Sequence, residues 1–229
     1  WLEYPPLVVR RAAAEKGLLR LFYRILTLGS TNLSPRSLEI DDRVGRFITV
    51  IGIPSAFLLH GYVGFIFGSI KANPWWSTPL MPIVFLFSAI VSGIAAVLLI
   101  YIIYCKSKKI PIDVPCLDTI AKYLYYAFIV DFSLETLDLV HRIYEADESF
   151  HTLDFMVKTR LYLPHIVVQI VLSTLVPLGL LALTQLVKLT DKTRRTVYAV
   201  AGGLTLVGIF AMRWNVVIGG QLFSKSFRG

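Results

Sequence analysis

Charged side chains lie inside apolar stretches of this sequence, where each of them is costly to bury. Asp131, Glu135 and Asp138 follow one another at intervals of four and three residues, and Arg142 follows four residues later. This spacing places all four side chains on one face of a helix. Such a stripe is expected to face the interior of a helix bundle, because ionisable groups within a membrane pair with one another or serve a function.

Other polar residues are predicted to lie at the same depth. His60 lies past the middle of its apolar run, and Arg213 and Asn215 lie near the end of the last run. If successive apolar runs form helices of alternating direction, these groups and the three acids reach the same, outer half of the membrane. His165 directly follows Pro164 and is interpreted as a structural or interfacial histidine.

Two interpretations of this cluster stay open. In the structural interpretation it is an ion-pair network between helices, with an acid of residues 117–141 as the partner of Arg213. In the functional interpretation it binds a quinone headgroup or transfers protons, because quinone chemistry needs hydrogen-bond donors and proton acceptors, which His and carboxylate side chains supply. The candidate residues are His60, Asp131, Glu135, Asp138, Arg213 and Asn215; none is assigned a catalytic role and no metal site is expected.

Three long runs without charged residues predict the membrane helices around this cluster. Residues 47–70, 72–105 and 161–187 contain no Asp, Glu, Lys or Arg. Each run is long enough to cross a membrane, which takes about 20 apolar residues. With the more polar segment 117–141, they predict an all-α, polytopic membrane bundle of about five transmembrane helices. The expected helices are 47–70, 80–104, 117–141, 161–187 and 196–218.

The composition supports this fold class over a soluble one. Charged residues make up 17% of the chain and hydrophobic residues 55%, whereas an average soluble domain carries roughly 25% charge. The net charge of +8 indicates basic cytoplasmic loops, not nucleic-acid binding. Cys105 and Cys116 lack the spacing of a zinc, haem or iron–sulfur motif, so no such group is expected on this chain.

The chain is predicted to have three parts: a basic amphipathic segment 1–46, a transmembrane bundle 47–218 and an extracytoplasmic tail 219–229. Residues 18–26 alternate apolar and basic side chains at helical spacing, which is typical of a helix in the membrane interface; the alternative is the frayed end of a longer helix. With five helices, the side that holds the N-terminal segment carries 15 Lys and Arg residues and the other side 6. The N-terminus is therefore predicted to be cytoplasmic.

Two sequence motifs occur in order at the end of the first predicted helix and in the loop that follows it. Residues 60–82 read HGYVGFIFGSIKANPWWSTPLMP, which contains the patterns HxYxGFxxG and PWWxTPLxP, and residues 85–95 continue as FLFSAIVSGIA. The last predicted helix ends in RWNVVIGGQ, residues 213–221. Over residues 45–225 the chain resembles the NrfD/PsrC family of polysulfide reductase membrane subunits, and most of all the membrane subunits of sulfur- and sulfate-respiring complexes.

The resemblance implies a haem-free subunit of a quinone-dependent oxidoreductase in the prokaryotic plasma membrane. Such a subunit exchanges electrons between menaquinone or ubiquinone and an extracytoplasmic iron–sulfur subunit, alongside a cytochrome c or molybdenum subunit. The family fold has two four-helix bundles, so a chain with fewer helices is expected to hold the later one. Relatives have their best-supported quinone site in the first bundle, and the site assigned to this chain is therefore an expectation from its own residues.

The outer face is predicted to contact the iron–sulfur subunit through Trp75, Trp76 and the acidic loop 142–160, because aromatic side chains are enriched at interfaces. Two other functions stay open. The chain is a structural anchor for a redox complex if the polar cluster only joins helices. It is a proton-translocating channel or transporter if the acidic stripe conducts protons, although five helices without an inverted repeat argue against a transporter.

Overall fold

The computed structural model of the chain describes residues 16–26, 34–73, 75–144, 154–155 and 157–221, without the side chains of residues 142 and 143. All regular structure in these ranges is helical, which confirms the predicted fold class. Several predicted features lie outside these ranges: residues 1–15, the acids Glu145, Asp147 and Glu148, and most of the tail 219–229.

Eight helical segments follow one another along the described chain. They are α2 (Leu18–Leu26), α3 (Pro35–Gly68), α4 (Met81–Lys108), α5 (Val114–Tyr144), η1 (Tyr162–Leu175), α7 (Val176–Leu186), α8 (Asp191–Trp214) and η2 (Asn215–Gly219). The segments η1 and η2 are π-helical. Because η1 continues directly into α7, and α8 into η2, each pair forms one membrane-length helix.

Four of the described helices are long and apolar enough to cross a membrane: Pro35–Gly68, Met81–Lys108, Tyr162–Leu186 and Asp191–Gly219. The fifth predicted span, α5, has a comparable length of 31 residues. It is not among the four because charged residues interrupt its apolar surface, among them Asp118, Lys122 and the acidic stripe. That α5 also crosses the membrane stays a prediction.

The first predicted membrane helix starts earlier than the uncharged run indicates. The run predicts a start at residue 47, whereas α3 begins at Pro35. Proline suits the first position of a helix, since it needs no backbone donor there. Ser34 caps this end, because its Oγ accepts a hydrogen bond from the backbone N–H of Ser37 at 3.3 Å. The charged residues that follow are tolerated in this part of the helix because their side chains are exposed or only partly buried.

The chain divides into two units, residues 1–58 and residues 59–229, and α3 runs from one into the other. In the first unit, α2 forms the helix that the sequence predicts for residues 18–26. Both its apolar and its basic side chains are exposed, including Leu18 and Ile25. Its place in the membrane interface stays a prediction.

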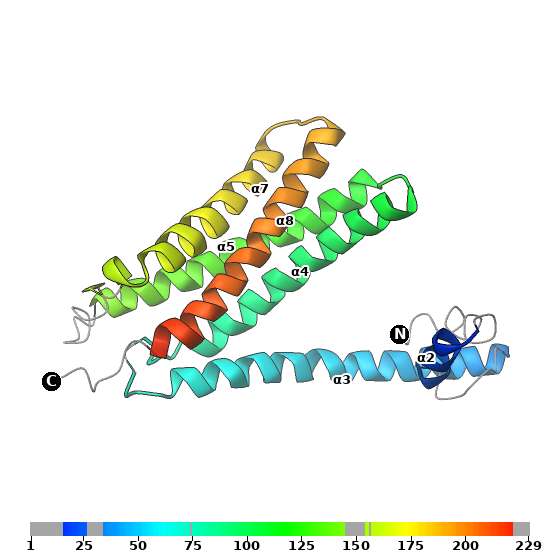
Figure 1. Cartoon of the computed structure of the whole chain (residues 1–229), viewed down its shortest axis with the longest axis horizontal. Coiled ribbons are helices and arrows are strands. Elements are labelled where there is room, and N and C mark those ends of the chain that lie inside the picture. The colour runs from blue at the N-terminus through cyan, green and yellow to red at the C-terminus, as the bar shows by residue number, and fades with distance from the viewer. Residues whose placement is uncertain (1–15, 27–33, 74, 145–153, 156, 222–229) are drawn as a thin grey trace. The chain divides into compact units, whose positions relative to one another are not determined.

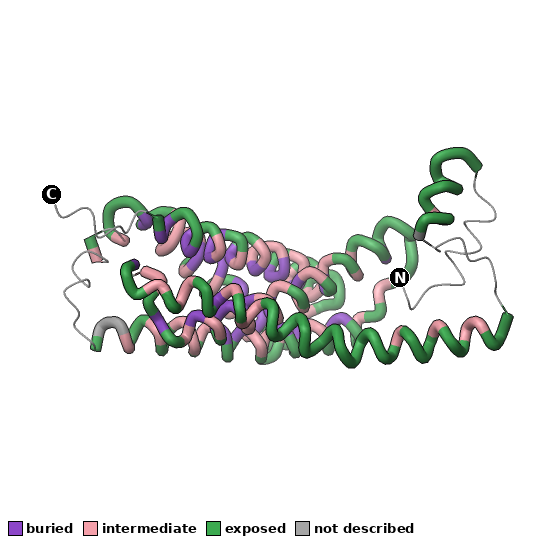
Figure 2. The backbone as a smooth tube through the Cα atoms, turned by 90° about the horizontal axis from the view of Figure 1, so that it is seen from below, coloured by how far each residue is buried: buried purple, intermediate pink, exposed green. Residues whose placement is uncertain are grey.

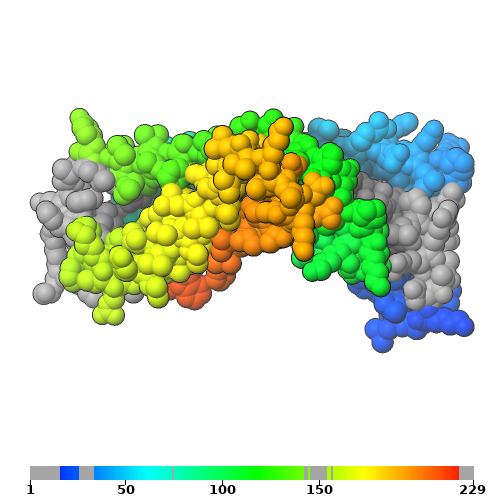
Figure 3. Space-filling view, turned by 90° about the horizontal axis from the view of Figure 1, so that it is seen from above, coloured from blue at the N-terminus to red at the C-terminus, as the bar shows by residue number. Residues whose placement is uncertain are grey.

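In the second unit, α4, α5, η1–α7 and α8 lie side by side along their lengths (Figure 1). Their buried positions lie on the facing sides of the helices, as Figure 2 shows by colour. In the space-filling view, α7 and the first half of α8 contact each other along one face (Figure 3). The core consists of Val91, Ala95, Leu98, Leu117, Ala121, Leu124, Phe128, Leu181, Tyr198 and Ala201.

Glycines allow two of the closest helix contacts. A Cβ at Gly64 would lie 2.6 Å from the Cα of Pro82, so the end of α3 touches the start of α4 almost backbone to backbone. A Cβ at Gly208 of α8 would overlap the side chain of Ser173 in η1. Small residues let membrane helices approach in this way. Both contacts help to define the end of the bundle at which α4 begins.

Candidate functional site

Residues 69–80, here called the Trp loop, connect α3 to α4 and are bound to the end of α8–η2. Asn73 Nδ2 donates to the carbonyl oxygen of Gly220 at 2.6 Å, and Trp76 Nε1 donates to that of Val216 at 2.6 Å. Gly220 lies so close to the Trp76 indole that a Cβ there would overlap the ring. The Trp loop is thus a packed part of the bundle, and we call this end the Trp-loop end.

Asp131, Glu135 and Asp138, the acidic stripe, lie on the half of α5 that approaches the Trp-loop end. Asp138 accepts a hydrogen bond from the hydroxyl of Thr78 in the Trp loop. Asp131 is only 5% exposed, and its buried Oδ1 atom has no hydrogen-bond partner. Glu135 is half-buried between them and interacts electrostatically with both aspartates. One oxygen of the acidic stripe, Asp131 Oδ1, therefore accepts no hydrogen bond from the described residues.

Arg213, in the last turn of α8, reaches across to α4. Its Nη2 donates to Ser88 Oγ at 3.0 Å and to the carbonyl oxygen of Phe85 at 3.3 Å. Its guanidinium carbon lies 4.4 Å from the centre of the Phe85 ring, within the range of a cation–π interaction. Two helices thus hold the guanidinium in a defined position.

The partner of Arg213 differs from the one that the sequence suggests. An acid of residues 117–141 is the expected partner, but no ion pair joins Arg213 to α5 in the described part of the chain. Arg213 and Asp131 are close enough to interact electrostatically without sharing a hydrogen bond. The physical reason is that a long arginine side chain can reach several acceptors. Ser88 Oγ and the Phe85 carbonyl oxygen lie within hydrogen-bond distance of its guanidinium. The half-buried cation of Arg213 and the buried carboxylate of Asp131 are consequently neighbours that share no hydrogen bond.

A second polar group joins η1 to η2. Asn215 Nδ2 donates to Gln169 Oε1 at 2.8 Å and to the carbonyl oxygen of Pro164 at 3.2 Å. Asn215 is 1% exposed, and its Oδ1 has no hydrogen-bond partner. His165 Nδ1 lies 3.1 Å from Gln169 Oε1, and the edge of its ring contacts Trp75. These contacts fit the predicted structural role of His165 and give Asn215 a buried, partly unsatisfied amide.

The six candidate residues thus fall into three positions. Asp131, Glu135, Asp138 and Arg213 surround one part of the Trp-loop end, and Asn215 belongs to the second polar group. His60 is half-buried on α3, one turn before Gly64. The described packing of this part of α3 against α4 comes from Val63, Gly64 and Phe67. That the six residues form a single connected site stays a prediction.

Three residues that complete these contacts are not among the predicted site residues. The sequence indicates only a small packing residue at Ser88, and it singles out neither Thr78 nor Gln169. Gln169 gives a usable signal, because an amide inside a long uncharged run must find hydrogen-bond partners once it is buried. Among the described residues, no cluster of His, Cys, Asp and Glu is arranged to hold a metal ion.

Comparison with known proteins agrees with the motif-based resemblance. The family described as Polysulphide reductase, NrfD matches residues 2–225, nearly the whole chain. The chain belongs to the NrfD family. As a member of this family with four helices of membrane-spanning length and composition among its described residues, it is a multi-pass membrane protein.

Two NrfD-family relatives are similar to parts of the chain. A selenate reductase subunit from Mesobacillus selenatarsenatis is 39% identical over 105 residues, which are 44% of this chain and 25% of that protein. Protein NrfD of Escherichia coli is 36% identical over 94 residues, 41% of this chain and 29% of that protein. The matched stretches thus span little more than a quarter of these relatives. No solved structure matches the chain.

Proposed function

We propose that this chain is a haem-free membrane subunit that exchanges electrons between membrane quinone and an extracytoplasmic iron–sulfur subunit. The observation that carries the proposal is the charge pair at the Trp-loop end, half-buried Arg213 and buried Asp131, which share no hydrogen bond. A charge inside a membrane costs about 3 kcal/mol even on the lenient insertion scale. A carboxylate kept there without a partner for one oxygen suits a ligand that supplies the missing hydrogen bond.

A quinol headgroup has the chemistry that this pair lacks. Its ring hydroxyl can donate to Asp131 Oδ1, which has no donor among the described residues. As the ring loses electrons, each hydroxyl must lose its proton, and a nearby carboxylate is a suitable acceptor. In the opposite direction, the guanidinium of Arg213 can donate to a quinone carbonyl. One pair of residues thus serves both redox states of the headgroup.

The rest of the acidic stripe offers a way out for the proton. Glu135 and Asp138 continue from Asp131 along α5, and Asp138 is hydrogen-bonded to Thr78 in the Trp loop. Carboxylates at this spacing can pass a proton from one to the next toward the loop. In this proposal the electrons leave at the same end, to the iron–sulfur subunit that docks on the Trp loop.

We propose that the Trp-loop end is extracytoplasmic and that the N-terminus of the chain lies in the cytoplasm of a prokaryotic cell. Lys106, Lys108 and Lys109 at the end of α4, and Lys188 and Lys192 before and within α8, lie at the opposite end of the bundle. Basic loops favour the cytoplasmic side. Cysteines placed at Lys108 and Lys192 should be protected from a membrane-impermeant thiol reagent added outside intact cells. Labelling of both from outside would overturn this orientation.

The function is tested by adding quinol to the purified complex and following the optical bleaching of the partner's iron–sulfur clusters. We expect the complex with the native chain to be reduced. A complex with Asp131→Leu, whose full assembly is checked in parallel, should be reduced far more slowly. If the assembled Asp131→Leu complex is reduced at the native rate, the charge pair only joins helices and the chain acts at this site as an anchor.

A further inference from the structure

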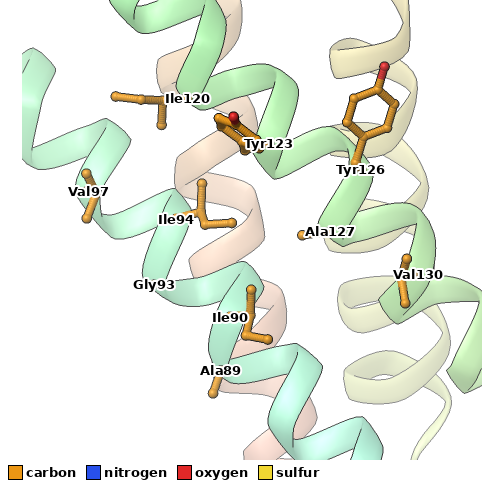
Figure 4. A pocket seen from close by; sticks show the side chains of 10 residues that line it. All are labelled: Ala89, Ile90, Gly93, Ile94, Val97, Ile120, Tyr123, Tyr126, Ala127 and Val130. Atoms are coloured by element: carbon orange, nitrogen blue, oxygen red, sulfur yellow. The ribbon is translucent and has the colours of Figure 1, made fainter. Parts of the chain in front are cut away.

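An apolar groove runs between α4 and α5 along the middle of the bundle, between residues 89–97 of α4 and 120–130 of α5. It has a volume of about 700 Å³, within the roughly 300–1,000 Å³ typical of ligand pockets. Figure 4 shows its two walls, with Ile90 and Ile94 of α4 and Tyr123 of α5 reaching into the space between the helices. The lining residues are Ala89, Ile90, Gly93, Ile94, Val97, Ile120, Tyr123, Tyr126, Ala127 and Val130.

Small side chains make the space. Ala89 and Gly93 on α4, and Ala127 on α5, leave room where larger residues would close the gap between the helices. A Cβ at Gly93 would meet no atom within 4 Å, so this stretch of α4 is open toward the groove. The lining is almost wholly apolar, and a ligand there can only be a hydrocarbon chain, because a polar ligand would lose its hydrogen bonds to water without replacement.

The groove adjoins the charge pair at one end. Ala89 is the neighbour of Ser88, which binds Arg213, and Val130 is the neighbour of Asp131. The Asp131 side chain is buried, and its Oδ1 atom has no partner. Asp131 itself does not line the groove. A ligand with its polar end at Val130 would lie one residue along the chain from an oxygen that needs a hydrogen-bond donor.

We propose that the α4–α5 groove binds the isoprenoid side chain of the quinol whose headgroup meets Arg213 and Asp131. This inference rests on the proposed function and adds the residues that recognise the side chain. The charge at the end of the groove selects against a phospholipid. The three carboxylates of the acidic stripe outnumber the one guanidinium of Arg213, whose Nη2 is already held by Ser88 and the Phe85 carbonyl. A phosphate is therefore disfavoured, whereas a quinol hydroxyl donates to a carboxylate.

The test compares two quinols with the same ring in the assembled complex: a long-chain menaquinol, and menadiol, which has no isoprenoid chain. Gly93→Phe fills the groove from the α4 side and Ala127→Phe fills it from the α5 side. Either substitution should raise the KM for the long-chain quinol about tenfold, the effect of losing the burial of a few methylene groups. The KM for menadiol should stay as in the native complex.

A matched control uses another helical glycine with open space. A Cβ at Gly179 of α7 also meets no atom within 4 Å, and this residue does not line the groove. Gly179→Phe should leave both KM values unchanged. An unchanged KM for the long-chain quinol in both groove variants, or an equal rise for the two quinols, would overturn the assignment of the side-chain site.

A binding measurement separates the quinol from membrane lipid. A long-chain quinone with a photoreactive group at the end of its side chain should label the peptide that contains Tyr123 and Tyr126, and excess menaquinone should prevent the labelling. Prevention by excess phospholipid instead would show that the groove holds lipid and would overturn the inference. A native complex that oxidises neither quinol would refute the proposed function itself, which is a different result from an unchanged KM.

Discussion

Each end of the helix bundle has an aspartate on α5 and an arginine on α8. At one end the two side chains are hydrogen-bonded to each other, and at the other end they are not. At the end away from the Trp loop, Asp118 of α5 accepts from Arg194 Nη1 at 2.5 Å and from the Tyr198 hydroxyl at 2.8 Å, both on α8. At the Trp-loop end, Asp131 of α5 and Arg213 of α8 are neighbours without a shared hydrogen bond.

This difference distinguishes a charge that holds helices together from a charge that can bind something else. Each oxygen of Asp118 has a donor, so the carboxylate is satisfied by the fold. Nη2 of Arg213 donates to α4 instead, and Asp131 Oδ1 has no donor among the described residues. Buried polar groups are nearly always hydrogen-bonded, and an exception calls for an explanation. A quinol hydroxyl is the explanation proposed for Asp131.

The largest effect is expected when the arginine at the Trp-loop end is removed. Arg213→Leu should lower quinol turnover by about 100-fold, the typical cost of losing a donor aimed at an oxygen that gains charge during the reaction. Arg194→Leu, the matched change at the other end, should leave turnover per assembled complex close to native. Stopped-flow reduction of the partner's clusters measures both. Equal losses in the two variants would erase the distinction between the ends.

A second change weakens the satisfied end. Asp118→Ala removes a carboxylate that two side chains hydrogen-bond, so the free energy of unfolding should fall by about 2 kcal/mol. Denaturant unfolding in mixed micelles measures this loss. The surviving assembled complex should oxidise quinol at the native rate. A variant with native stability would show that the Asp118 contacts do not hold α5 and α8 together.

A smaller change loosens the Trp-loop end without touching its charges. Trp76→Phe keeps an aromatic ring and removes the hydrogen bond to the Val216 carbonyl, which contributes about 1 kcal/mol. Amide hydrogen exchange should become faster in η2 and stay native around Tyr198. Faster exchange in η2 alone would show that the two ends of the bundle open independently. Faster exchange at both ends would mean that the bundle opens as one unit.

Much of the fold could be predicted from the sequence, because the membrane helices depend on uncharged runs that are visible along the chain. The same runs also give the expected depth of Asp131 and Arg213 in the membrane, which stays a prediction. The start of α3 could not be predicted this way, because residues 36–46 carry charges and still form a helix. The role of Asp118, near the start of α5, could not be predicted from the sequence either, because charges near helix ends are ordinarily solvated.

The contacts of the candidate site were less predictable than its residues. The choice of Arg213 between Asp131 and Ser88 depends on distances of a few ångströms between helices, which spacing along the sequence does not encode. The hydrogen bond between Asn215 and Gln169 joins residues 46 positions apart. Such pairings arise from the packing of η1 against α8, where Gly208 admits Ser173. Sequence therefore identified which side chains are costly to bury, and the fold determined which of them are paired.

The most direct test of the account is the quinol turnover of two assembled complexes, one with Asp131→Asn and one with Asp118→Asn. Both changes replace a carboxylate on α5 with an amide of nearly the same size. We expect turnover to fall at least tenfold for Asp131→Asn, which removes the proton acceptor, and to stay near native for Asp118→Asn. Native turnover in the Asp131→Asn complex would contradict the claim that the unpaired carboxylate serves quinone chemistry.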